Sequence, residues 1–172
     1  KFNRPVKKTI FKAYNHIYHN VDWANGKDVK CFLGFEPSSE PLIVKVALSP
    51  VNADNARMNL RENDTWNFEA VRQQAVAAWE KELGNIRIEG TDDQKAIFYT
   101  GLYHAYIQPN TISDINGEFM YANYTTGKTE KGEAHYSTFS LWDTFRACHP
   151  MYTLLKQDRV ADFVKSMLRQ YD

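Results

Sequence analysis

Residues 67–84, NFEAVRQQAVAAWEKELG, decide how the chain is divided. Apolar residues recur in this stretch with a period near 3.6, at Phe68, Val71, Ala75, Trp79 and Leu83. That period is typical of one face of an α-helix. Gly84 stands where a helix commonly ends, because glycine adopts the backbone conformation of a C-terminal cap without strain. We therefore predict a helix here, with differently patterned regions on its two sides.

The region before this helix alternates between apolar and polar residues. Two sets have the period of two that places side chains on one face of a strand: Val29, Cys31, Leu33 and Phe35, and then Leu42, Val44, Val46 and Leu48. Residues 36–41, EPSSEP, indicate a turn between the two sets. Phe11 to Tyr18 suggest another, less regular strand, and Pro50 ends the strand region. We predict antiparallel strands up to about Asn63.

The region after Gly84 is predicted to be mostly helical. A short extended stretch at residues 86–88 precedes Thr91 and Gln94, which together form a capping box at a helix start. The helix should run to about Ile107 and end at Pro109. Apolar residues cover most of its circumference, so we expect it to be buried among other helices, with His104 in the core.

A long loop between Pro109 and Ser137 follows this helix. Loops of that length are uncommon in compact domains and are often functional. Asn116-Gly117 is typical of a type I′ turn, and a second turn is indicated near Thr126-Gly127-Lys128.

The last part of the chain is predicted to hold two or three more helices. Ser140 is expected to cap a helix that contains Trp142, Asp143 and Arg146, and Pro150 should kink or restart it. Asp158 is expected to cap the last helix. Periodicity alone thus predicts an α+β fold in which strands, one bridging helix and further helices follow in that order.

The bulk composition excludes some classes of partner. The 172 residues include 21 basic and 21 acidic side chains, so the formal charge is zero, which argues against a nucleic-acid-binding protein. No apolar run is long enough to cross a bilayer. The aromatic content of 14% suits sugar binding, and it suits a packed core equally well. Cys31 and Cys148 can form a disulfide only if the fold brings them together.

The run from Thr138 to Arg146, TFSLWDTFR, is the most informative for chemistry. A sugar site needs a flat apolar ring beside a carboxylate, because the ring covers the C–H face of a pyranose and the carboxylate accepts hydrogen bonds from hydroxyls. Trp142 and Asp143 supply both. The alternative is structural: Asp143 bonds back to the Ser140 amide and favours the helix dipole, and Arg146 pairs with Asp143.

Two other polar patterns do not predict a metal site. His16 and His19 lie three apart in a predicted strand, so they point to opposite faces. Asp114, Asn116 and Glu118 superficially resemble a calcium-binding loop, but the glycine at its sixth position and its distal glutamate are missing. A turn is the better interpretation of the second pattern.

Several stretches together resemble the bacterial α-mannosidases of glycoside hydrolase family 92. They are residues 46–51 (VALSPV) with Asn55-Ala56, 94–104 (QKAIFYTGLYH), 109–114 (PNTISD), 136–146 (YSTFSLWDTFR) and 150–155 (PMYTLL). The resemblance implies an N-terminal antiparallel β-sandwich joined by a linking helix to an (α/α)6 barrel. It assigns residues 1–64 to the end of the sandwich, residues 65–84 to the linker and residues 85–172 to the first barrel helices. The chain, which starts at Lys1 and ends within a helical pattern, is expected to be cut at both ends.

The same resemblance implies a calcium-dependent, inverting exo-mannosidase, periplasmic, cell-surface or secreted. Its substrates are terminal α-linked mannose residues, with an expected α-1,2 linkage, in N-glycans or mannans. An inverting enzyme uses one carboxylic acid and one carboxylate on opposite faces of the sugar. The family's acid and base lie in a Gly-Asn-Glu-Pro-like motif and in a motif that contains Asp-Asp. The first is missing here, and the only adjacent aspartates, Asp92-Asp93, belong to the predicted helix start at Thr91 and are not matched to the second. We therefore assign no catalytic residue and no calcium ligand to this chain, and expect it to be inactive alone.

What the resemblance does place in this chain is a contact to the mannose that is cleaved. Trp142 and Asp143 match that contact, and Arg146 is a weaker candidate. Truncated barrel helices should expose apolar surface and favour self-association. Two alternatives stay open: a non-catalytic carbohydrate-binding or helical interaction module, and a different (α/α)6-barrel glycosidase, since Trp-Asp pairs at helix starts also resemble those of glucosidases and trehalases.

Overall fold

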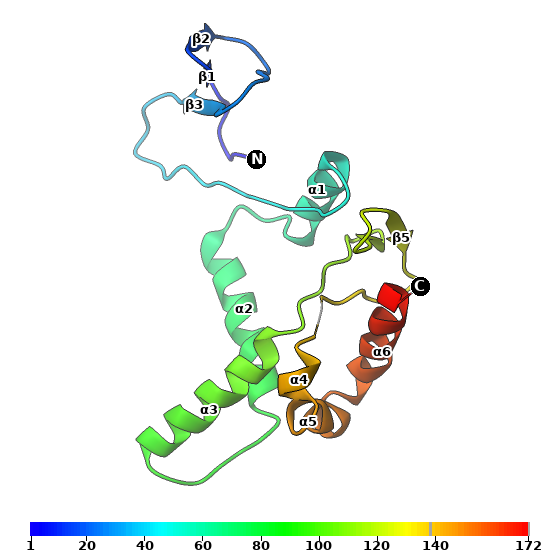
Figure 1. The fold of residues 1–172 in the computed structure, drawn as a ribbon. Coiled ribbons are helices and arrows are strands. Elements are labelled where there is room, and N and C mark those ends of the chain that lie inside the picture. Colours follow the sequence, from blue (N-terminus) through cyan, green and yellow to red (C-terminus); the bar gives the residue numbers. More distant parts are fainter. Residues whose placement is uncertain (138, 172) are drawn as a thin grey trace. The chain divides into compact units, whose positions relative to one another are not determined.

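The structure is a computed structural model that describes residues 1–137 and 139–171, so that Thr138 of the TFSLWDTFR run lies outside the described residues. It divides into two compact units, Lys1–Val46 and Ala47–Asp172. Figure 1 shows both units and labels most of their helices and strands. Within the described residues, no helix has the length and apolar character that crossing a membrane requires. Cys31 and Cys148 are both free thiols.

The first unit holds a three-stranded antiparallel sheet of order β2-β1-β3. Its strands are β1 (Lys8–Ala13), β2 (His16–His19) and β3 (Lys30–Gly34). The strand predicted around Cys31 is confirmed as β3. The single irregular strand predicted from Phe11 to Tyr18 is wrong, because the chain reverses at Tyr14, whose φ of 52° allows a tight turn, and forms two strands.

The strand predicted at residues 42–48 is also wrong. Its only ladder contact in the described residues is an isolated bridge between Val44 and Phe2. Val46 is 80% exposed. An alternating pattern gives a strand only where a neighbour accepts its backbone hydrogen bonds, and here the neighbour is just the short segment around Phe2.

The second unit begins with two short helices in a region where the sequence predicts strands. They are α1 (Ala53–Asn59) and the 3₁₀ helix η1 (Leu60–Glu62). The Asn52 side chain caps α1 by accepting a hydrogen bond from the Asn55 amide at 2.8 Å. That cap satisfies an otherwise unpaired donor and outweighs the extended tendency of the preceding residues.

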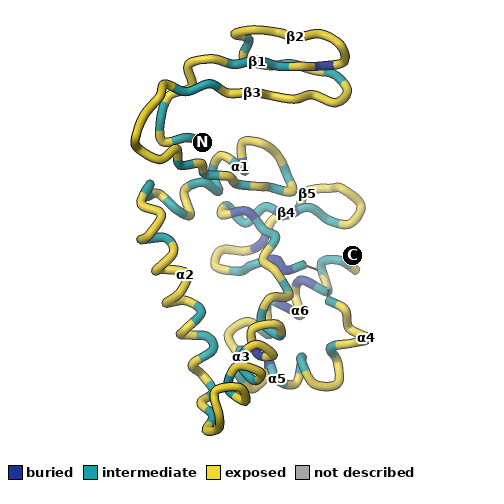
Figure 2. The backbone as a smooth tube through the Cα atoms, turned by 90° about the vertical axis from the view of Figure 1, so that its left-hand side faces the viewer, coloured by how far each residue is buried: buried dark blue, intermediate teal, exposed yellow. Residues whose placement is uncertain are grey.

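The two long helices lie close to their predicted limits. They are α2 (Phe68–Leu83), which ends at Gly84, and α3 (Asp92–Ile107), which starts with the Thr91–Gln94 capping box. Residues 86–88 between them form no strand. The expected burial of α3 is wrong for the described residues: Leu102 is its only buried residue, and His104 is exposed. Figure 2 shows the backbone of α2 and α3 mostly in the colours of exposed and intermediate residues.

The long loop contains a small antiparallel hairpin, β4 (Glu118–Met120) paired with β5 (Thr126–Lys128). Gly117 has a φ of 83°, as the predicted Asn116-Gly117 turn requires. The second predicted turn is wrong, because residues 126–128 are strand β5. Glycine is required at position 127 for close packing: an added Cβ would lie 2.5 Å from the Tyr121 ring and 2.6 Å from the Phe119 ring.

The remaining helices are α4 (Leu141–Thr144), α5 (Cys148–Leu155) and α6 (Gln157–Tyr171). The chain restarts as α5 with Pro150 in the first turn, as predicted, since proline is tolerated there. Ser140 occupies the N-cap position of α4, as predicted, but its side chain makes no cap hydrogen bond within the described residues. The predicted extent of this helix is wrong, because α4 has only four residues and ends before Arg146. The Asp158 cap prediction is also wrong, because Asp158 lies inside the first turn of α6 rather than before it.

The core of this unit is aromatic. Tyr136, Tyr152 and Phe163 form the buried cluster, and Phe139 and Val160 pack against it. The Phe163 ring centroid lies 4.7 Å from that of Tyr136 and 5.4 Å from that of Tyr152, both in edge-on arrangements. This cluster joins α5 and α6 to the segment that leads into α4, so it fixes the surroundings of the predicted sugar contact.

Candidate functional site

The predicted sugar-binding pair lies on α4, a single short turn. The Ser140 carbonyl accepts hydrogen bonds from the amides of Asp143 at 2.9 Å and Thr144 at 3.0 Å. The Thr144 hydroxyl also donates to it at 3.0 Å. Trp142 is 81% exposed and Asp143 is exposed as well. A ring and a carboxylate are thus adjacent and accessible, the combination that a pyranose requires.

The structural alternative for Asp143 and Arg146 is not formed. Within the described residues, no ion pair or side-chain hydrogen bond joins them, and Asp143 makes none to the Ser140 amide. The Arg146 guanidinium instead lies over the Phe145 ring, 4.9 Å from its centroid. The Asp143 carboxylate therefore remains available to a ligand. The binding roles of Trp142, Asp143 and Arg146 stay predictions.

The segment that leads into α4 pairs with the loop that the sequence places nearby. The Ser137 amide donates to the Asn110 carbonyl at 2.8 Å, and the Asn110 amide donates to the Ser137 hydroxyl at 3.0 Å. Thr111 and Tyr136 form a bridge next to them. These contacts place residues 110–113 beside residues 135–137, a few positions before α4.

Sequence reasoning missed a buried hydrogen-bond network around Asp114. This side chain is 5% exposed. Its carboxylate accepts hydrogen bonds from the Ser49 hydroxyl at 2.6 Å and from the side-chain amides of Asn55 at 2.8 Å and Asn59 at 2.6 Å. The Asn55 side-chain amide also donates a hydrogen bond to the Glu118 carboxylate at 2.8 Å and thereby lowers the pKa of that carboxyl. The network fixes α1 and Ser49 to the turn before β4.

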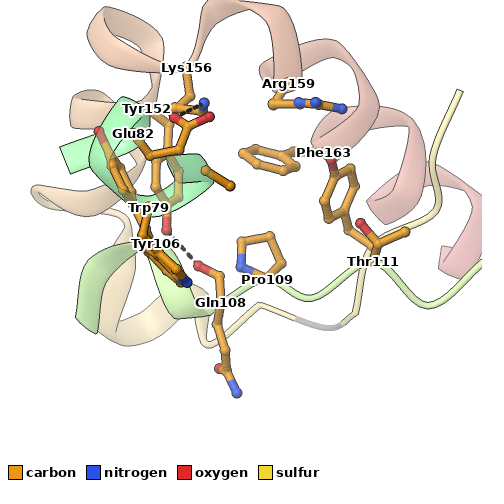
Figure 3. Close-up of a pocket in the computed structure, with 12 residues that line it drawn as sticks. Trp79, Glu82, Tyr106, Gln108, Pro109, Thr111, Tyr152, Lys156, Arg159 and Phe163 are labelled. Carbon is orange, nitrogen blue, oxygen red and sulfur yellow. Dashed lines mark hydrogen bonds and ion pairs between the residues drawn. The ribbon is translucent and has the colours of Figure 1, made fainter. Parts of the chain in front are cut away.

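A second feature is a cavity of about 300 Å³ within the same unit, drawn in Figure 3. Its lining residues come from α2, α3, α5, α6 and the segments between them, and include Trp79, Tyr106, Pro109, Tyr152, Arg159 and Phe163. Glu82 and Lys156 form an ion pair of 2.6 Å at its edge. Neither Trp142 nor Asp143 is among the lining residues. The cavity is therefore a separate feature from the predicted sugar contact.

Two tyrosine hydroxyls that line the cavity differ in their hydrogen bonding. The Tyr152 hydroxyl lies 2.6 Å from the Ala105 carbonyl oxygen and 2.7 Å from that of Gln108, which ties α5 to the end of α3. Figure 3 shows the second of these contacts as a dashed line. The Tyr106 hydroxyl is buried and has no partner within the described residues. Burial raises the pKa of both tyrosines.

One fully buried histidine lies between the hairpin and α6. The His135 ring stacks on Phe119 with centroids 3.8 Å apart, and its Nε2 lies 3.1 Å from the Gln170 side-chain nitrogen. Burial, with a smaller contribution from the charge of Arg169, lowers the pKa of His135 to about 4. The ring is thus neutral at physiological pH and contributes packing rather than charge.

A calcium site needs several oxygen ligands gathered at one place. No group of three or more His, Cys, Asp and Glu side chains in residues 1–137 and 139–171 is arranged to hold a metal ion. The nearest candidates, Asp114 and Glu118, already accept hydrogen bonds from Ser49, Asn55 and Asn59.

An exposed Trp-Asp pair beside a helical, aromatic core is an arrangement that suits a carbohydrate-active protein. The comparison with known families agrees. Residues 55–172 match the family described as the glycosyl hydrolase family 92 catalytic domain, and the chain belongs to that family. This membership confirms the predicted resemblance and decides against a different barrel glycosidase.

Solved structures and one curated relative are similar to this chain. A family GH92 α-mannosidase from Bacteroides thetaiotaomicron matches with a TM-score of 0.83 and 31% identity, over 99% of this chain and 24% of that one. A family GH92 inverting mannosidase from the same bacterium matches with a TM-score of 0.71 and 24% identity, over 89% and 21%, and supports the fold alone. An uncharacterized secreted glycosidase from Arthroderma benhamiae is 31% identical over 96 residues, 51% of this chain and 12% of its own length. The chain thus spans about a quarter of the solved relatives, or less.

Proposed function

We propose that this chain is part of an exo-acting α-mannosidase that removes terminal α-linked mannose, with an expected α-1,2 linkage, from N-glycans or mannans. Family membership over residues 55–172 supports a glycosidase. The similarity to a solved family GH92 α-mannosidase along 99% of the chain supports mannose as the sugar. That relative has also been solved in complex with mannoimidazole.

The observation that carries the proposal is the exposed Trp142-Asp143 pair on α4. In the proposed complex the indole covers the C–H face of the terminal mannose, and the Asp143 carboxylate accepts hydrogen bonds from its hydroxyls. A charge-assisted hydrogen bond of this kind contributes about 1.5–3 kcal/mol. Arg146, held over Phe145, has a secondary role at most.

The proposed architecture follows the family. Residues 1–64 complete an N-terminal β-sandwich, residues 65–84 form the linker, and residues 85–172 begin an (α/α)6 barrel. The mixed fold, with a three-stranded antiparallel sheet followed by helices and a small hairpin between α3 and α4, is compatible with this arrangement. Catalysis is proposed to be inverting, with the acid, the base and the calcium ligands supplied by other parts of a longer enzyme.

The proposed location is the periplasm, the cell surface or the extracellular medium. The curated relative from Arthroderma benhamiae is described as secreted, which supports that assignment. Mannose-containing glycans at those sites would be accessible to the enzyme.

Two preparations test the function. The longer enzyme should release mannose from an α-1,2-linked mannobiose and lose this activity when a chelator removes calcium. The 172-residue chain alone should release none, with or without calcium, because no acid and base pair is assigned to it. Calcium-dependent mannose release by the chain alone would contradict the division of roles. A longer enzyme that cleaves only other glycosides would contradict the substrate.

A further inference from the structure

Two side chains of α6 hold the backbone of the segment that leads into α4. The Asp162 carboxylate accepts from the Ala134 amide at 3.3 Å. The Ser166 hydroxyl accepts from the Tyr136 amide at 3.0 Å. Asp162 and Ser166 are four residues apart, so they lie on the same face of the helix. They bond alternate residues of the segment, as a neighbouring strand would.

The other side of the same segment is held by the loop at residues 110–113. The His135 carbonyl accepts from the amides of Ile112 at 2.8 Å and Ser113 at 3.3 Å. The His135 amide donates to the Ser113 hydroxyl at 3.1 Å. Residues 134–137 are therefore fixed between α6 and this loop, and their backbone has little freedom to move sideways.

The contact with α6 continues up to the start of α4. The Phe139 ring lies 5.5 Å from the Phe163 ring and 5.3 Å from the His149 ring, between centroids. Phe163 also packs on Tyr136 at 4.7 Å. One helix thus holds the residues on both sides of position 138, immediately before the turn that presents Trp142.

We propose that Ser166 is a positioning residue for the sugar contact: by holding the Tyr136 backbone against α6, it determines where Trp142 and Asp143 lie. The inference rests on the proposed function, since it assumes that this pair contacts the sugar. Ser166 is 1% exposed. Its hydroxyl donates to the Asp162 carbonyl at 2.7 Å and accepts from the Tyr136 amide at the same time. Alanine can do neither and leaves a buried amide unpaired.

Kinetics of the longer enzyme provide the first test. Ser166→Ala should lower kcat/KM about tenfold, mainly by raising KM, because a small displacement of a binding group weakens the substrate complex. Ser166→Thr keeps the hydroxyl and should restore most of the loss. The control is Val160→Ala, which removes packing against the same aromatic core and keeps the hydrogen bonds of Asp162 and Ser166 to residues 134 and 136. It should lower Tm and leave KM unchanged.

A spectroscopic test separates this inference from the proposed function. With 5-fluorotryptophan in the 172-residue chain, the Trp142 signal is identified by its absence in Trp142→Phe. Ser166→Ala should shift or broaden that ¹⁹F signal and leave the Trp23 signal unchanged, whatever the substrate proves to be. An unchanged Trp142 signal in Ser166→Ala would overturn the positioning role. So would equal changes in Val160→Ala, which would indicate general destabilisation.

Discussion

Asp114 and Asp143 carry the same carboxylate in opposite surroundings. Asp114 is buried and accepts hydrogen bonds from Ser49, Asn55 and Asn59. Asp143 is exposed on α4 and has no side-chain partner within the described residues. A carboxylate whose lone pairs are occupied internally stabilises the fold, whereas one left free can bind a ligand. The contrast separates structural from functional polar residues in this chain.

The largest effect is expected for the buried carboxylate, Asp114, and concerns the stability of the fold. Asp114→Ala should lower the free energy of unfolding by about 3–4 kcal/mol, because it removes at one buried site the acceptor of three hydrogen bonds, from Ser49, Asn55 and Asn59. Urea denaturation of the chain measures this loss. The matched control is Asp143→Ala, which should change stability by less than about 0.5 kcal/mol. Similar losses for both variants would remove the distinction between the two carboxylates.

The buried side chain of His135 extends the comparison to a group whose contribution to stability depends on pH. Burial lowers the pKa of His135 to about 4 from 6.5, so the unfolded chain binds more protons between these values. The contribution of neutral His135 to the free energy of unfolding is fully present above pH 6.5. It falls by roughly 3 kcal/mol as the pH drops toward 4. Arg169, with its ion pair to Glu133, and Gln170 are the polar neighbours.

The variant His135→Gln isolates this contribution. Unfolding by urea at several pH values should give a flatter pH dependence for the variant between about pH 6.5 and 4, whatever its absolute stability. The ion pairs of Glu133 are common to both proteins and cancel in the difference. Identical slopes would show that His135 is protonated equally in the folded and unfolded states.

The smallest expected effect concerns exposed apolar side chains. Ile97 on α3 is 74% exposed, and Phe68, Leu154 and Leu168 are exposed as well. Exposed apolar side chains favour association. The 172-residue chain should therefore form dimers or larger species as its concentration rises, as light scattering would detect. Ile97→Lys should reduce this tendency. A monomer at all concentrations would contradict the prediction.

Local signals in the sequence identify the elements that local chemistry stabilises. The period of Phe68 to Leu83 and the Thr91–Gln94 capping box predict α2 and α3 because both signals lie within the helices themselves. The stretch around Val44 shows the limit of such signals. Its alternation predicts a strand, but pairing depends on a distant segment, and within the described part of the chain it forms only at Phe2.

The polar residues of the candidate site also differ in whether neighbouring residues in the sequence reveal them. Trp142 and Asp143 are neighbours along the chain, so the sequence alone is enough to indicate their combination of ring and carboxylate. The Asp114 network cannot be found in this way, because Asn55 and Asn59 lie 59 and 55 residues away. The length of α4 is not predictable either, since a serine before a helix does not reveal whether its hydroxyl accepts a hydrogen bond.

The most direct test of the central claim compares Trp142 with another exposed tryptophan in the longer enzyme. Trp142→Ala and Asp143→Asn should each lower kcat/KM on an α-mannoside by about tenfold to a hundredfold, with no loss of Tm. The control is Trp23→Ala, which removes a side chain of similar exposure, 76% against 81%. It should leave kcat/KM unchanged. Near-normal activity of both Trp142→Ala and Asp143→Asn would contradict the assignment of this pair as the sugar contact.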